Sequence, residues 1–164
     1  MRWVHVHIEG VVQGVGFRPF VFKLANDFNL KGWVCNGVDG VHLEVGGQEK
    51  LVEEFIEQLS THAPEESYIT RFAVDEISEI EVSDFRIVDS NPLGTPNLLI
   101  TPDLGLCNNC REEIHNESDR RYQYPFITCT HCGPRYSILK SLPYDRHTTS
   151  MENFTMCPEC ENEY

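Results

Sequence analysis

Three Cys-x-x-Cys pairs are the residues of this 164-residue chain with the clearest capacity for chemistry. They are Cys107 and Cys110, Cys129 and Cys132, and Cys157 and Cys160, with 18 residues between the first pair and the second. Two pairs at this spacing can supply four thiolates to one tetrahedral zinc ion, and such a closed site leaves no position for a substrate. We therefore predict structural zinc, with iron as the minor alternative.

Which pairs share a metal ion is open. Sequential pairing would join the first two pairs, whereas an interleaved arrangement would join the second pair to the third. We favour sequential pairing. The third pair, which repeats the first 50 positions later, then begins a second finger that is truncated, and the chain is expected to be a piece of a longer protein.

A glycine-rich stretch is the second candidate site. It consists of Gln13, Gly14, Val15, Gly16, Phe17 and Arg18, between an expected strand and an expected helix. Such a turn can direct backbone N–H groups at an anion, and the guanidinium of Arg18 suits phosphate. The stretch lacks the Gly-Lys-Ser/Thr ending of a P-loop. Taken alone, it is more typical of a tight connection beside a surface arginine.

Hydrophobic periodicity predicts the elements that must position these groups. Alternation predicts strands over 2–9, 32–36, 40–46, 69–77 and 82–88, and apolar stripes predict helices over 20–28 and 51–59. Pro19 is expected at the first position of the first helix, where its missing N–H costs nothing. The order β-α-β-β-α-β, with one more short strand, predicts an α+β ferredoxin-like sandwich of two helices on an antiparallel sheet.

Composition divides the chain into two domains. Residues 1–90 (the first module) have enough apolar residues for a core of their own, residues 91–106 read as a linker, and residues 107–164 (the finger region) depend on metal. The expected absence of a signal peptide and of a membrane-spanning run predicts a cytoplasmic protein, in which the thiols stay reduced. The net charge of −13 argues against nucleic acid as a partner.

Residues 4–88 resemble acylphosphatase through Val-Gln-Gly-Val-Gly-Phe-Arg at 12–18 and Gly-Trp-Val-Cys-Asn at 32–36. The resemblance implies the ferredoxin-like fold, hydrolysis of acyl phosphates, and catalytic roles for Arg18 and Asn36. The loop and Arg18 would hold the phosphate, while the Asn36 carboxamide would orient the attacking water. Two departures from the family, Cys35 and His42, are expected to weaken activity without abolishing it.

The text 119–136 around the second cysteine pair, and Leu-Pro-Tyr-Asp-Arg at 142–146, resemble the hydrogenase maturation carbamoyltransferases. That resemblance implies that carbamoyl phosphate is cleaved in the first module. Absent downstream domains would then activate the carbamate with ATP and transfer it to the C-terminal cysteine of a partner protein, for the cyanide ligands of nickel–iron hydrogenase.

Plainer interpretations remain beside these. The first module could be a catalytically degenerate scaffold, with the zinc fingers serving protein–protein docking. Cys35 reads as a small strand residue, and three histidines read as strand-face side chains with a minor metal alternative: His5, His7 and His42. Arg120 and Arg121 read as a solvated pair. Aromatic side chains are expected to pack the core of the finger region, namely Tyr122, Tyr124 and Phe126.

Overall fold

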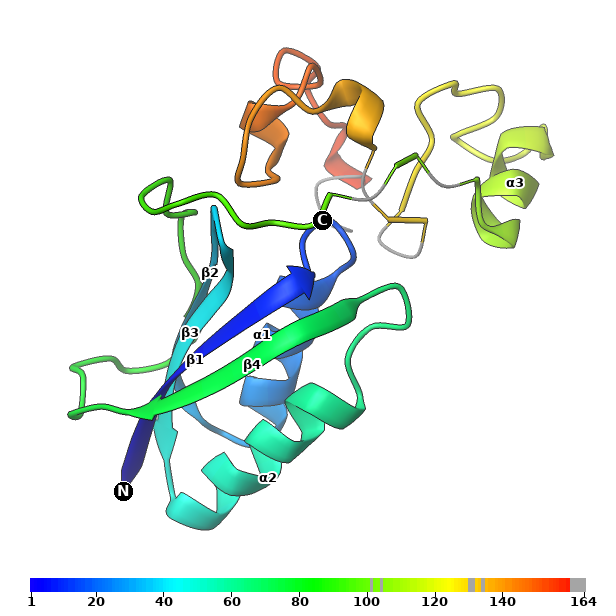
Figure 1. Ribbon diagram of the computed structural model, residues 1–164. Helices are drawn as coiled ribbons and strands as arrows, with labels where there is room; N and C mark the ends of the chain where they lie inside the picture. Colours follow the sequence, from blue (N-terminus) through cyan, green and yellow to red (C-terminus); the bar gives the residue numbers. More distant parts are fainter. Residues whose placement is uncertain (101, 104, 130–131, 134, 160–164) are drawn as a thin grey trace.

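A twisted five-stranded sheet with two helices on one face forms the first half of the chain in the computed structural model (Figure 1). A smaller region with little regular structure follows it, beyond the end of the sheet at which β1 ends and α1 begins. The structure describes all residues except 101, 104, 130–131, 134 and 160–164.

The predicted order of elements is confirmed. The first module contains β1 (Arg2–Val11), α1 (Phe17–Asp27), β2 (Lys31–Gly37), β3 (Gly40–Gly47), α2 (Glu49–Thr61), β4 (Tyr68–Glu76) and β5 (Phe85–Ile87). The finger region contains α3 (Asn108–His115) and two short 3₁₀ helices, η1 (Tyr136–Ile138) and η2 (Arg146–Thr148).

The strand order is β4-β1-β3-β2-β5, with β1 antiparallel to both of its neighbours. The final strand departs from the prediction in two ways. It is shorter than 82–88, and it runs parallel to β2, although the remaining pairs are antiparallel. The successive antiparallel pairs make β4 run opposite to β2. A chain that reverses direction after β4 and crosses to the other edge of the sheet therefore runs parallel to β2.

Period-two alternation places the apolar side chains of the sheet beneath the helices. Val4, Val6 and Ile8 of β1 are fully buried, and the register sets Val4 opposite Val45 and Val6 opposite Leu43. The stripe of α2 buries Val52, Phe55 and Leu59 in the same cluster. Complete burial of one such side chain stabilises the fold by about 1.5–3 kcal/mol.

Helix α1 begins earlier than the position of Pro19 suggested. Phe17 is its first residue, and the amide of Phe20 donates to the Gly16 carbonyl at 3.0 Å. Pro19 is therefore the third helical residue, where the N–H still has no intrahelical acceptor and its loss is tolerated. The shift places Arg18 inside the first turn of the helix.

The expected linker packs against the first module along part of its length. The amide of Asn91 donates to the Asn36 carbonyl at 2.8 Å, and the amide of Asn97 donates to the Val38 carbonyl at 3.1 Å. The Asn97 side chain also donates to the Glu9 carboxylate at 2.8 Å. Among the described residues, the helices are too short or too polar to cross a membrane.

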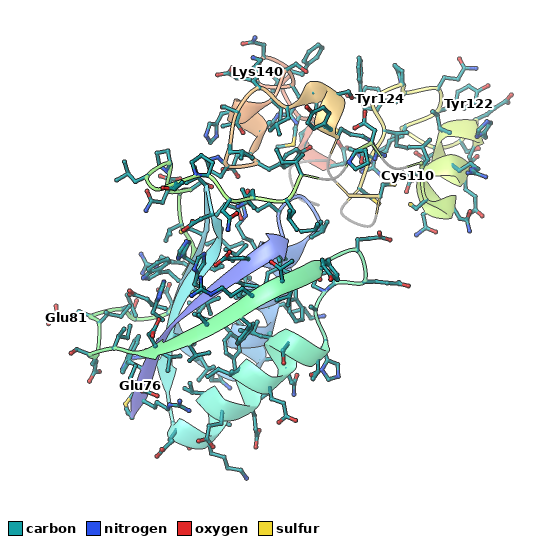
Figure 2. All side chains as sticks on the ribbon, viewed as in Figure 1. Glu76, Glu81, Cys110, Tyr122, Tyr124 and Lys140 are labelled. Carbon is teal, nitrogen blue, oxygen red and sulfur yellow. The ribbon has the colours of Figure 1, made fainter. Side chains whose placement is uncertain are left out.

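The finger region has a small core, and its composition corrects one expectation. Cys110, Ile127 and Cys132 form its hydrophobic cluster among the residues described. The aromatic side chains predicted to pack there are exposed instead, and Figure 2 shows Tyr122 and Tyr124 on the outside: Tyr122 at 39%, Tyr124 at 42% and Phe126 at 52%. The cysteines fill the interior, which leaves too little volume for large rings.

Candidate active site and metal centre

The glycine turn between β1 and α1 has the backbone conformation that its sequence suggests. Gly14 and Gly16 have φ angles of 74° and 76°, in the left-handed region that side chains with a Cβ disfavour. Gly16 is also the N-cap of α1, and as a glycine it has no side chain that could cap the helix. Amides in a turn of this shape, together with the first turn of a helix, can bind an anion.

Gln13 holds this turn against the hairpin that joins β2 to β3. Its side-chain amide donates to the carbonyls of Gly37 and Gly40, at 2.7 Å and 2.8 Å. Gln13 is 6% exposed, so these bonds are shielded from water. The contact brings the glycine turn beside the end of β2, where Asn36 lies.

Arg18 and Asn36 converge on two consecutive residues of the finger region. The Arg18 Nη2 atom donates to Asp145 Oδ1 at 2.7 Å, and Asn36 Nδ2 donates to the Tyr144 carbonyl at 3.2 Å. The Tyr144 amide in turn donates to Gln13 Oε1 at 2.8 Å. Residues 143–149 (the covering segment) therefore lie over the site that the sequence predicts.

Neither Tyr144 nor Asp145 was predicted as a site residue. Both lie in an irregular stretch without periodicity, so local pattern carries no information on where they fold back. The only available signal was the Pro-Tyr-Asp-Arg text at 143–146, which carried the family resemblance but had no role assigned to it.

Cys35 lies beside this site and is 4% exposed. Burial raises the pKa of its thiol, although the backbone of Asn91 and the charge of Arg18 act in the opposite direction. A thiol kept protonated is a poor nucleophile and a poor metal ligand. The environment therefore agrees with a small strand residue rather than a reactive cysteine.

The three strand histidines stack on the sheet face opposite the helices. His42 lies between His5 and His7, with ring centroids 5.4 Å and 4.2 Å away. Its Nε2 atom is 2.9 Å from Asp39 Oδ1. Burial opposes ionisation of the Asp39 carboxylate, yet this hydrogen bond, the charges of His42 and His7 and a backbone hydrogen bond together lower the pKa of Asp39. His7, Asp39 and His42 bring their ligand atoms within 4.8 Å of one another.

Four thiols come together in the finger region. Ligand atoms from Cys107, Cys110, Cys129 and Cys132 lie within 4.8 Å of one another. Cys129 Sγ is 3.7 Å from Cys107 Sγ and 3.8 Å from Cys132 Sγ. A tetrahedral zinc ion with Zn–S bonds of about 2.3 Å requires sulfur atoms about 3.8 Å apart. The four residues therefore fit zinc in the sequential arrangement.

Backbone amides prepare two of these sulfur atoms, those of Cys107 and Cys132, to carry charge, whereas burial raises the pKa of the Cys110 thiol. The amide of Cys107 donates to Cys132 Sγ at 3.1 Å, and that of Cys110 donates to Cys107 Sγ at 3.5 Å. Burial opposes ionisation of Cys132, yet the hydrogen bonds, first among them that from the Cys107 amide, lower its pKa to about 6. Figure 2 shows Cys110 on the side of α3 that faces the rest of the finger region.

The third pair is placed only in part. Cys157 is exposed, and its sulfur accepts a hydrogen bond from the Arg120 guanidinium at 3.6 Å. Cys160 lies outside the described residues. Arg121 is not a simple solvated arginine, because its guanidinium pairs with the Glu113 carboxylate of α3 at 2.8 Å.

Comparisons with known proteins follow this division of the molecule. The acylphosphatase family profile matches residues 4–87, and the HypF finger profile matches residues 106–139. An acylphosphatase of Chlorobaculum tepidum is 42% identical over 88 residues, which are 52% of this chain and 94% of that protein.

Longer relatives match both parts. Carbamoyltransferase HypF of Synechocystis is 43% identical over 94% of this chain and 20% of its own length. A crystal structure of full-length HypF in the phosphate- and nucleotide-bound form matches with a TM-score of 0.91 at 47% identity, over 99% of this chain and 22% of that one. The chain thus spans about a fifth of the length of these carbamoyltransferase relatives. It belongs to the acylphosphatase family through residues 4–87 and carries the HypF finger over residues 106–139.

Proposed function

We propose that this chain hydrolyses acyl phosphates, and carbamoyl phosphate in particular, at the site formed by residues 13–18 and Asn36. The observation that carries the proposal is the convergence of Gln13, Arg18 and Asn36 on one two-residue stretch, Tyr144 and Asp145. Three side chains from separate parts of the first module meet beside a left-handed glycine turn, and the amides of such a turn can bind an anion.

Positioning and charge neutralisation would supply most of the catalysis. The turn amides and Arg18 would hold the phosphate and neutralise charge on its oxygen atoms. Asn36 would orient a water molecule whose oxygen forms the new P–O bond while the bond from phosphorus to the acyl oxygen breaks. The water proton would pass to a phosphate oxygen, and the products are inorganic phosphate and carbamate. None of these protein groups needs to titrate.

The finger region is proposed to bind zinc through Cys107, Cys110, Cys129 and Cys132. Their sulfur separations and N–H···S bonds support this. When bound, the ion would supply structural cross-linking only, since four protein ligands close its coordination shell. The Cys-x-x-Cys spacing of Cys157 and Cys160 predicts a second metal site. We place the domain boundaries at residues 90 and 106.

The wider role follows the names of the longer relatives. A carbamoyltransferase would pass the carbamate to other domains and then to the C-terminal cysteine of a partner protein, in the cytoplasm. These steps require parts of a protein about five times as long as this chain.

Phosphate release from carbamoyl phosphate and benzoyl phosphate tests the proposed hydrolysis. Arg18→Ala should reduce kcat/KM by roughly 100- to 1000-fold, because it removes the principal positive charge at the transferring phosphoryl group. Arg86→Ala is the matched control, since Arg86 forms only an exposed ion pair with Asp84. Rates equal to buffer in the folded, metal-loaded wild-type protein would contradict the proposal.

A scaffold function is the second candidate, and one contact favours it. Arg18 already has a carboxylate partner within the chain, Asp145 at 2.7 Å, which competes with phosphate for the guanidinium. A degenerate site closed by its own covering segment would leave the fingers to dock a protein. The same assay separates the two functions, because a scaffold predicts no phosphate release above buffer in wild-type protein.

A further inference from the structure

Two buried oxygen atoms at the proposed site lack a hydrogen-bond donor. They are Asn36 Oδ1 and Asp145 Oδ2, each without a partner among the residues that the structure describes. Asn36 is 1% exposed and Asp145 is 8% exposed, so bulk water does not readily compensate them. An unpaired buried acceptor destabilises the folded protein, and more so when it is charged. A ligand that brings N–H or O–H donors would remove this destabilisation.

Asp145 is held in place through its backbone and through one of its two carboxylate oxygen atoms. The amide of Asp145 donates to Thr148 Oγ1 at 3.0 Å, and the amide of Thr148 donates back to the Asp145 carbonyl at 3.0 Å, which fixes the start of η2. Asp145 Oδ1 is bound by Arg18, and the neighbouring Tyr144 is bound by Gln13. Oδ2 is therefore a rigid acceptor, and a rigid acceptor discriminates between ligands more sharply than a mobile one.

The chemistry of the substrate decides which part of it can reach Asp145. A phosphate group offers mainly anionic acceptors, so it cannot satisfy a carboxylate oxygen and would repel it. The attacking water can donate to Asn36 Oδ1. The remaining acceptor, Asp145 Oδ2, requires a neutral donor on the acyl side of the substrate. The NH₂ group of a carbamoyl phosphate is such a donor, whereas the methyl group of acetyl phosphate, which has nearly the same shape, is not.

We propose that Asp145 is the specificity-determining residue of this site and accepts a hydrogen bond from the carbamoyl NH₂ group. This inference rests on the proposed function, because it assumes that acyl phosphates bind beside Arg18. It assigns a role to the finger region. The stand-alone acylphosphatase relatives match only about half of this chain over nearly their whole length, and the acylphosphatase family profile ends at residue 87, before the covering segment. A site that forms a hydrogen bond with a donor group of its substrate rejects an analogue that lacks this group far more strongly than an apolar pocket does.

The test compares kcat/KM for carbamoyl phosphate and acetyl phosphate in the metal-loaded 164-residue chain. Wild-type protein should favour carbamoyl phosphate by roughly 10- to 100-fold, the range for a hydrogen bond to a charged group. Asp145→Ala should bring the ratio close to one, and Asp145→Asn, which keeps one acceptor oxygen, should give an intermediate ratio. Glu152→Ala is the matched control, because Glu152 forms an exposed ion pair with Lys140 in the same region.

Two results overturn the proposal. If the ratio of kcat/KM for carbamoyl phosphate to that for acetyl phosphate in Asp145→Ala stays within about twofold of the wild-type ratio, the carboxylate does not distinguish the two acyl groups. An equal acceleration of both substrates in Asp145→Ala means that Asp145 only blocks Arg18. If Asp145→Ala loses its zinc or its folded tryptophan fluorescence, Asp145→Asn decides, because its shape is nearly unchanged.

A binding measurement separates this inference from the proposed hydrolysis. Phosphonoacetamide and acetonylphosphonate replace the bridging oxygen by CH₂, cannot be hydrolysed, and differ only in NH₂ against CH₃. Calorimetric titration should show about tenfold tighter binding of phosphonoacetamide to wild-type protein, and no preference in Asp145→Ala. Absent turnover with selective binding would refute the hydrolase function alone. Equal binding of both compounds to wild-type protein would refute the role of Asp145.

Discussion

The first module buries 18 apolar side chains in one core, whereas the hydrophobic cluster of the finger region contains only three buried side chains among its described residues, those of Cys110, Ile127 and Cys132. A core of the first kind can fold through the hydrophobic effect alone, but three small side chains cannot offset the conformational entropy of the segment. The finger region must therefore be held by something else, and its four converging thiols indicate a metal ion. The two regions nevertheless share one site, because Asp145 and Tyr144 meet Arg18, Gln13 and Asn36.

Removal of metal should separate the two regions most completely. Structural zinc contributes about 10–16 kcal/mol in small fingers, so Cys110→Ser or a strong chelator should unfold the finger region while the first module stays folded. Metal analysis should find zinc in the untreated wild-type protein. Limited proteolysis should cut after residue 106 only in the chelator-treated protein or in Cys110→Ser. Both tryptophans, Trp3 and Trp33, lie in the first module, so their fluorescence should change little.

Cys35→Ser is the control for this experiment, since Cys35 is a buried residue of β2 and is not part of the thiol cluster. It should keep the metal and the protease resistance. A reduced, folded protein that contains no zinc and still resists proteolysis in the finger region would contradict the inference that a metal ion holds this region folded.

A cavity in the first module should have the opposite effect. Phe55 is fully buried, and Phe55→Ala should lower the free energy of unfolding of this module by about 3–5 kcal/mol while the zinc content is unchanged. Urea titration followed by tryptophan fluorescence measures it. Phe154→Ala, at a finger-region ring that is 53% exposed, should change that value by less than about 0.5 kcal/mol.

A substitution in the glycine turn shows how far the site formed by both regions depends on backbone conformation. Gly16→Ala forces a residue with a Cβ to a φ of 76° and should destabilise the first module by about 1–2 kcal/mol. Because Gly16 caps the helix that carries Arg18, phosphate release should fall as well. Gly105→Ala is the matched control, since a Cβ there meets nothing within 4 Å. Equal stability of the two variants would show that the turn is not constrained.

The smallest expected effect concerns pH. Burial, followed by the charge of His42 at 3.3 Å, lowers the pKa of His5 below its usual 6.5. Below that pH the unfolded chain binds more protons than the folded protein, so the stability of the first module should fall as pH drops through 6.5. His5→Gln should flatten this part of the curve of unfolding free energy against pH, and His62→Gln, on the exposed end of α2, serves as control. A steep decline that persists in His5→Gln would assign the effect elsewhere.

Periodic patterns allowed most of the first module to be predicted, and the reasons are local. The stripe of Val52, Phe55 and Leu59 and the alternation of Val4, Val6 and Ile8 each report one buried face. The parallel pairing of β5 could not be predicted, because three residues carry no directional signal. Asp145 escaped prediction for a related reason. It reaches Arg18 from 127 positions away through a segment without periodicity, so only the folded backbone reveals the contact.

That long sequence separation has a consequence for synthesis on the ribosome. Translation proceeds at about 5–20 residues per second, so roughly 3–11 seconds pass between the emergence of residue 88 and that of Asp145. During this interval the nascent first module can already fold with its arginine uncovered. If Asp145 has the proposed role, the site would become selective only when the later segment arrives and its cysteines bind metal, which would link the timing of substrate selectivity to the supply of zinc in the cell.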